Sequence, residues 1–257
     1  MKRVVSVLLL LAMLFLLTAC GKSAAVKAAE EAIDVIGEVT VNSGEAVANA
    51  KKLYELLTED EKAKVRNRVT LIEAEEAYGE LADGMAREKA EEAFDLLREA
   101  AAICISGVEL IERAWYFGIH EADDYGSNVF IFLAMEVPFT STELEAACNS
   151  FGLNAYHASQ NWDICVMTVI KVLQDRGDYT TLSTTVTEAE TILNDLKTEC
   201  DDDTYYPVLM EYLNVIDSYA NFFASPSGSY SELGDTMAAH EGTIASLEFE
   251  IEMLLDE

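Results

Sequence analysis

The stretch "LLREAAAIC", residues 96–104, decides the fold class. Its apolar residues recur at the spacing of one face of an α-helix, at Leu96, Leu97, Ala100, Ile103 and Cys104. The helical pattern extends over residues 85–122, and the sequence "DDYGS" then ends it. A helix of this length with an apolar face predicts a fold built by packing helices together.

Helix-forming residues dominate the rest of the chain as well. Ala, Glu and Leu are abundant, and only 3 prolines and 13 glycines interrupt 257 residues. We expect further helices over residues 24–36, 47–57, 58–83, 142–174, 187–199, 209–223 and 230–255. Short loops between them predict an all-α fold, an antiparallel up-and-down helical bundle over residues 26–257. An alternative is two stacked helical subdomains, divided near residue 84 or within residues 126–140.

Local signals predict where helices start and which faces are buried. Thr58 with Glu61, and Thr142 with Glu145, have the spacing of a capping box. Helical spacing predicts buried faces at Val47, Ala50, Tyr54 and Leu57, at Val65, Val69 and Ile72, and at Leu209, Tyr212, Ile216, Tyr219 and Phe223.

The stretch "NVFIFLAMEV", residues 128–137, has two interpretations. Its β-branched and aromatic residues suit a buried strand. No second strand is predicted to pair with it, however, and an isolated strand leaves its backbone groups unpaired. A short buried helix is the better prediction.

The first twenty residues resemble an export signal. Lys2 and Arg3 precede fourteen residues without a charge, Val4–Leu17. A membrane-spanning helix needs roughly 20 apolar residues, whereas an apolar core of this length suits a signal peptide. The sequence Leu17, Thr18, Ala19, Cys20 is similar to the bacterial lipobox, in which a lipid is attached to the cysteine and the chain is cut before it.

The lipobox resemblance implies three segments and a location. Residues 1–19 are the expected lipoprotein signal peptide, and residues 20–25 the lipidated tether, with lipid attachment at Cys20. Two acyl chains give durable anchoring. We therefore expect the domain at the outer face of the bacterial cytoplasmic membrane, with the membrane as a partner through the lipid on Cys20.

Composition excludes some partners. The net charge is −30 at pH 7, and a charge of this size repels polyanions. Nucleic acid is therefore not an expected partner, and the domain itself is not expected to dock on anionic lipid. Cationic partners remain compatible with this charge.

The cysteines and histidines do not form a recognisable metal or catalytic motif. Cys104 and Cys165 lie in apolar helical settings, and we expect them, with Cys148 and Cys200, to be mostly unpaired thiols. His120-Glu121 begins like the HExxH zinc motif, but Asp124 replaces the second histidine. No catalytic residue, cofactor or metal is predicted.

Two short acidic or charged motifs have ordinary explanations. The run Asp201-Asp202-Asp203 is expected to be a solvated loop, because a calcium site needs six or more oxygen ligands in a set geometry. Arg176-Gly177-Asp178 spells a tripeptide that integrins read, but Gly and Asp are also common turn residues between helices.

Two regions resemble a known family. The first comprises Ile36, Gly37, Glu38, Val39, Thr40, Leu53, Tyr54, Leu56, Val65, Asn67, Leu71, Ala74, Glu75, Tyr78 and Leu81. The second runs from Tyr205, Tyr206 and Pro207 through Tyr219 to Pro226, Ser227, Gly228 and Ser229. Together they cover roughly a third of the chain and resemble all-helical lipoproteins of Firmicutes, many from gut Clostridia. The resemblance implies fold and location, and it carries no assigned activity.

Aromatic residues are concentrated between positions 115 and 162. The candidate binding surface consists of Trp115, Tyr116, Tyr125, Tyr156 and Trp162. Aromatic residues also fill bundle interiors, so a core and a ligand groove are the two alternatives. We expect a membrane-tethered extracellular binding or scaffold module of the cell envelope, with an envelope or extracellular protein as partner. The alternative is an enzyme with a site assembled from non-adjacent residues.

Overall fold

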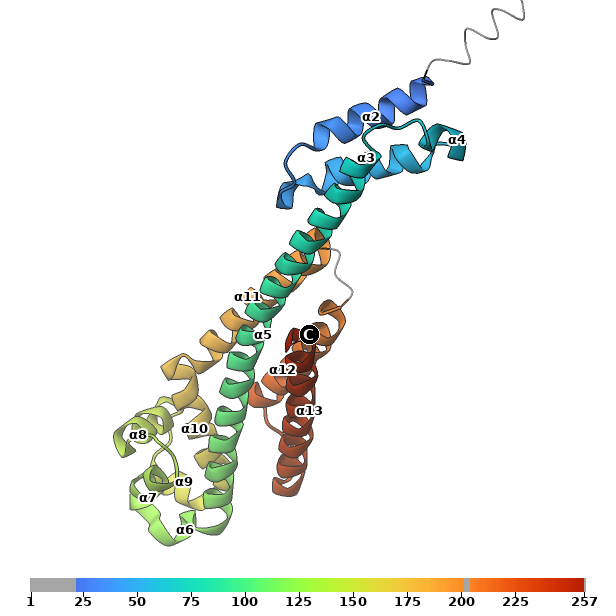
Figure 1. The fold of residues 1–257 in the computed structure, drawn as a ribbon. Coiled ribbons are helices and arrows are strands. Elements are labelled where there is room, and N and C mark those ends of the chain that lie inside the picture. The colour runs from blue at the N-terminus through green and yellow to red at the C-terminus, as the bar shows by residue number, and fades with distance from the viewer. Residues whose placement is uncertain (1–21, 201–203, 257) are drawn as a thin grey trace, which may run out of the picture. The chain divides into compact units, whose positions relative to one another are not determined.

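A computed structural model describes residues 22–200 and 204–256, apart from the side chain of Glu199. The described residues form helices and contain no β-strand, so the expected all-α helical bundle is confirmed (Figure 1). The α-helices are α2 (Ala24–Ile36), α3 (Gly44–Glu55), α4 (Glu59–Lys62), α5 (Arg68–His120), α6 (Ala122–Tyr125), α7 (Val129–Glu136), α8 (Ser141–Ser150), α9 (Ala155–Gln160), α10 (Trp162–Arg176), α11 (Asp178–Glu199), α12 (Tyr206–Ala224) and α13 (Tyr230–Asp256). Two 3-10 helices, η1 (Val41–Ser43) and η2 (Gly126–Asn128), complete them.

The chain divides into two compact units, each with its own apolar core. Residues 22–85 form unit 1, and residues 86–256 form unit 2. Helix α5 contributes its N-terminal part to unit 1 and the remainder to unit 2.

Unit 1 is a helical hairpin completed by the start of α5. Helices α2 and α3 pack together through Val26, Ile33 and Ala50, which are almost fully buried. Tyr78 of α5 lies directly against Gly44 at the start of α3, where a Cβ atom would be 2.3 Å from the tyrosine oxygen. This core is small, and it is separate from the core of unit 2.

Unit 2 has the up-and-down topology of a bundle. Tyr212 of α12 contacts Glu248 of α13 and Tyr219 contacts Glu241, so these two helices are antiparallel. Phe94 of α5 meets Tyr212, and Gly107 meets Phe223, so α5 and α12 are parallel. Lys89 of α5 contacts Asp195 near the end of α11, and Tyr179 near the start of α11 stacks on Phe223, which meets Gly107 of α5. Helix α11 is therefore antiparallel to α5.

Several predicted elements are confirmed. The predicted face of α12 is buried, with Leu209, Tyr212, Ile216, Tyr219 and Phe223 all fully inaccessible. Residues 129–136 form the short helix α7, with Val129, Phe130 and Leu133 in the core. Thr58 and Glu61 form the expected capping box, with Thr58 N and Glu61 Oε2 3.2 Å apart.

The predicted division of residues 58–122 into two helices is wrong. Helix α5 continues without interruption through Gly84, and the N-terminal boundary moves to Arg68. The expected face at Val69 and Ile72 is also wrong, because both side chains are exposed and Leu71 and Ala74 are buried instead. Val65 lies before α5, so helical spacing counted from Val65 does not carry into that helix.

Two further predictions need correction. The capping box of α8 consists of Thr140 and Glu143, and not of Thr142 and Glu145. The backbone N–H of Thr140 donates to Glu143 Oε2 at a distance of 2.8 Å. The helix expected over residues 142–174 is divided into α8, α9 and α10. Gly152 adopts φ 72°, which ends α8, and the Asn154 side chain then accepts from the backbone N–H groups of Tyr156 and His157 to start α9.

Helix α11 begins earlier than residue 187, at Asp178. Gly177 precedes it with φ 90° and ends α10, as expected for a turn. The Arg176 guanidinium pairs with Glu143 at 2.9 Å and lies 4.4 Å from the centre of the Phe139 ring. These contacts give the sequence Arg176-Gly177-Asp178 a structural role, as a packed turn between α10 and α11.

Candidate functional site: a tryptophan-lined cleft in unit 2

The structure brings together two of the five aromatic candidates. Trp115 of α5 and Trp162 of α10 stack with ring centres 4.9 Å apart and an angle of 15° between the ring planes. Trp115 is 4% exposed and belongs to the core, whereas Trp162 is 41% exposed. One indole is therefore fixed by the interior and supports a second that is open to solvent.

The stacked indoles line an open cleft of about 510 Å³. The end of α5 contributes Trp115, Gly118 and Ile119, and α6 contributes Asp123. The remaining lining residues are Ser159, Gln160 and Trp162 from the α9–α10 junction, and Gly228, Ser229 and Tyr230 from the α12–α13 junction. Three segments distant in sequence thus meet at this cleft.

The residues next to Trp162 and the glycine that it contacts fix the position of its backbone. Asn161 has an extended backbone and serves both as the C-cap of α9 and as the N-cap of α10. Gly118 lies against the backbone of Trp162, where an added Cβ atom would be 2.7 Å from the Trp162 carbonyl oxygen. The absence of a side chain at position 118 is therefore what allows α10 to start so close to α5.

The other three aromatic candidates do not line the cleft. Tyr116 is exposed, and its ring lies 6.0 Å from that of Tyr230 and 4.5 Å from that of His120. Tyr125 is half-buried and stacks on Phe132 at 3.8 Å. Tyr156 is 63% exposed and does not line the cleft, although its carbonyl accepts a hydrogen bond of 2.9 Å from the lining residue Ser159. The five predicted residues therefore do not form one surface: Trp115 and Trp162 line the cleft, and the other three side chains lie outside its lining.

Sequence reasoning missed the contribution of residues 228–230. The Tyr230 hydroxyl donates a hydrogen bond to the Glu112 carboxylate, and this bond raises the pKa of Tyr230 to about 12. Glu232 accepts from the backbone N–H of Ser229, which orders the turn before α13. The loop sequence "SPSGS" signalled a turn, but nothing in it indicated which part of α5 it would meet.

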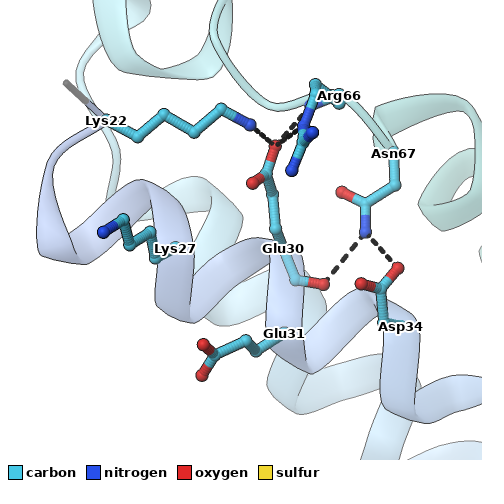
Figure 2. Close-up of a pocket in the computed structure, with 7 residues that line it drawn as sticks. All are labelled: Lys22, Lys27, Glu30, Glu31, Asp34, Arg66 and Asn67. Atoms are coloured by element: carbon cyan, nitrogen blue, oxygen red, sulfur yellow. Dashed lines mark hydrogen bonds and ion pairs between the residues drawn. The ribbon is translucent and has the colours of Figure 1, made fainter.

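A second pocket, in unit 1, is lined by charged residues and is shown in Figure 2. Glu30 of α2 is 7% exposed and accepts from the Lys22 ammonium, from Arg66 N at 2.8 Å and from Arg66 Nε at 3.4 Å. The Lys22 bond is the main reason that the pKa of Glu30 falls to about 2. Asn67 Nδ2 donates to the Glu30 carbonyl at 2.9 Å and to Asp34 at 2.7 Å. The Glu30 carboxylate and the Asn67 amide nitrogen are thus paired, whereas Asn67 Oδ1 is buried and has no hydrogen-bond partner among the described residues. We interpret these hydrogen bonds as a network that holds unit 1 together.

The histidines and buried cysteines have structural surroundings. His157 completes the cap of α9 next to Asn154, and His240 stacks on Tyr219 at 4.7 Å, where burial lowers its pKa. Cys104, Cys148 and Cys165 are buried and form no disulfide, and burial raises the pKa of Cys104 and Cys165 to about 12. Within residues 22–200 and 204–256, no cluster of three or more His, Cys, Asp or Glu side chains could hold a metal ion.

The candidate lipid-attachment residues Leu17, Thr18, Ala19 and Cys20 lie outside the described residues, as does the run Asp201–Asp203. Among the helices that the structure describes, none combines the length and apolar character required to cross a membrane. No protein-family model, curated protein or solved structure matches this chain.

Proposed function

We propose that this protein is a membrane-tethered, extracellular binding module of the cell envelope, with the tryptophan-lined cleft as its ligand site. The observation that carries the proposal is the stacked pair of Trp115 and Trp162, open on one side within a concave surface. Ligand sites are typically concave, largely apolar, and supplied with a few polar groups that fix orientation. This cleft has that composition, with Gln160, Ser229 and Asp123 beside the indoles.

The expected binding energies favour this cleft over the acidic surface as the ligand site. A partly exposed aromatic side chain offers a large apolar contact area at little entropic loss, and such residues dominate binding hot spots. Exposed carboxylates in salt contribute about 0–1 kcal/mol per pair. The tether in the proposal comes from the lipobox resemblance of residues 17–20, which would hold the module at the membrane surface.

The chain provides a built-in reporter for testing the cleft. It contains 2 tryptophans, and both line this cleft, so tryptophan emission reports on this site alone. We expect a small-molecule fraction of an envelope extract to change the emission of the purified full chain in a saturable way.

Two variants test whether the change arises from binding in the cleft. Trp162→Ala should abolish binding measured by calorimetry, while far-UV circular dichroism stays unchanged. Tyr156→Ala removes an exposed aromatic residue outside the cleft and should leave binding intact. The proposal is wrong if no fraction changes the emission, or if both variants lose binding equally.

A further inference from the structure

The chemistry of the lining residues narrows the ligand class. Among the described residues that line the cleft, Asp123 alone carries a charge, and it is negative. The remaining polar groups are the Gln160 amide and the hydroxyls of Ser159, Ser229 and Tyr230. An anionic ligand would therefore meet a carboxylate with no lysine or arginine among these residues to offset it.

The indole faces favour a positive charge. Tryptophan is the best aromatic partner for a cation, because its ring carries negative charge density on its faces. Trp115 stacks on one face of Trp162, which is 41% exposed and lines the cleft. A cation placed there would meet an indole and lie in the same cleft as Asp123.

A charged group next to the residues that line the cleft is also negative, like Asp123. The Tyr230 hydroxyl is already bonded to the Glu112 carboxylate, so a second acid lies just behind the cleft wall. The whole chain carries a net charge of −30, which attracts cations and raises their rate of encounter. A neutral ligand gains nothing from this field.

The size of the cleft favours a small molecule. Its volume of about 510 Å³ falls within the range of roughly 300–1,000 Å³ that is typical of small-molecule sites. We infer that the cleft binds a small organic cation, an ammonium group with an apolar body, held between the Trp162 indole and the Asp123 carboxylate. The inference rests on the proposed function, because it names the ligand class of the same cleft.

A matched pair of probes tests the charge requirement. Choline and its neutral carbon isostere, in which a tert-butyl group replaces the trimethylammonium group, have nearly the same shape. We expect choline to change the tryptophan emission of the full chain and to bind at least about tenfold more tightly than the isostere. Choline affinity should also fall as salt rises, since the attraction to Asp123 is screened.

Variants assign the effect to named groups. Asp123→Asn should weaken choline binding by about fivefold, as expected for an exposed charge pair. Asp124→Asn removes the same charge one residue away, outside the lining, and should change binding by less than about twofold. Trp162→Phe, which keeps an apolar ring with a weaker face, should lose affinity for choline more than for the isostere.

Two sets of results overturn the inference and separate it from the proposed function. If choline and the isostere bind equally, or if a neutral saccharide or a lysine-rich peptide changes the emission and choline does not, the small-cation class is wrong. The cleft then remains a binding site. If no probe and no envelope fraction changes the emission, both the inference and the proposed function are wrong.

Discussion

Replacing Gly118 by alanine tests the structural basis of the cleft. An added Cβ atom would lie 2.7 Å from the Trp162 carbonyl oxygen, 3.0 Å from its Cα and 3.1 Å from its Cβ. The first two atoms belong to the backbone at the start of α10 and cannot rotate away. The substitution therefore has to move α10 relative to the end of α5.

The expected cost follows from two opposing effects. Overpacking a well-packed contact costs about 1–3 kcal/mol. Alanine has a higher helix propensity than glycine, which returns at most about 1 kcal/mol. We expect Gly118→Ala to lower the free energy of unfolding of unit 2 by about 1–2 kcal/mol, which corresponds to roughly 2–8 °C in Tm for a unit of this size.

The matched control is Gly242→Ala in α13, which lies in the same unit. No atom outside its own helical backbone lies within 4 Å of a Cβ added there. This variant should gain stability by about 0.5–1 kcal/mol, because only helix propensity changes. Urea unfolding, followed by circular dichroism and by tryptophan emission, measures both variants. If Gly118→Ala is as stable as Gly242→Ala, the close approach of Trp162 to α5 is refuted.

Three further predictions concern thiols, acid and lipid. The buried thiols of Cys104 and Cys165, with pKa values raised to about 12, should resist alkylation in the native protein and react after unfolding without reductant; mass spectrometry distinguishes this from a disulfide. The pKa of Glu30 falls from 4.5 to about 2, so its stabilising effect is present above pH 4.5 and is lost as pH falls toward 2. Glu30→Gln should therefore destabilise unit 1 near neutral pH and make its unfolding midpoint less sensitive to acid; an unchanged acid profile would exclude this role. Cys20→Ala should abolish incorporation of labelled fatty acid, and continued labelling would contradict the lipobox interpretation.

The error at α8 shows what local sequence could and could not decide. The sequence "TSTELE" contains two capping boxes of identical spacing, Thr140 with Glu143 and Thr142 with Glu145. The structure uses the first, which places Phe139 before the cap and Leu144 in the first full turn, and both are buried. This pair has the positions of a hydrophobic staple. Taking the flanking apolar residues into account would have selected the correct box from sequence.

The uninterrupted course of α5 could not be predicted from local signals. A single glycine in a helix costs only about 1 kcal/mol relative to alanine, and the residues on either side of Gly84 are anchored in the two separate cores. Periodicity succeeded where one face is buried over a whole helix, as in α12, where Tyr212, Tyr219 and Phe223 point into the core. It failed at Val69 and Ile72, because the preceding turn was counted as helix.

The candidate site was half predictable for a physical reason. Trp115 and Trp162 could be chosen from the sequence because both lie in one region rich in aromatic residues, although 47 positions separate them. Other contacts that form the cleft join residues much farther apart in the sequence. The Tyr230–Glu112 bond spans 118 positions and depends on how α13 returns along α5. Such a pairing is decided by packing of the whole bundle and leaves no local signal.

Ligand binding and folding of unit 2 must be coupled, because the cleft exists only when α5, α10 and the α12–α13 junction are assembled. A ligand that binds only the folded state, present at 100 times its Kd, raises the free energy of unfolding by about 2.7 kcal/mol. Both tryptophans lie in unit 2, whereas Tyr54 and Tyr78 pack against the small core of unit 1. A ligand of the cleft should therefore shift the unfolding transition seen by tryptophan emission and leave the acid-sensitive transition of unit 1, set by Glu30, in place. A ligand that shifted only the unit 1 transition would have to bind elsewhere, and the charged pocket of Figure 2 would then replace the tryptophan-lined cleft as the site to test.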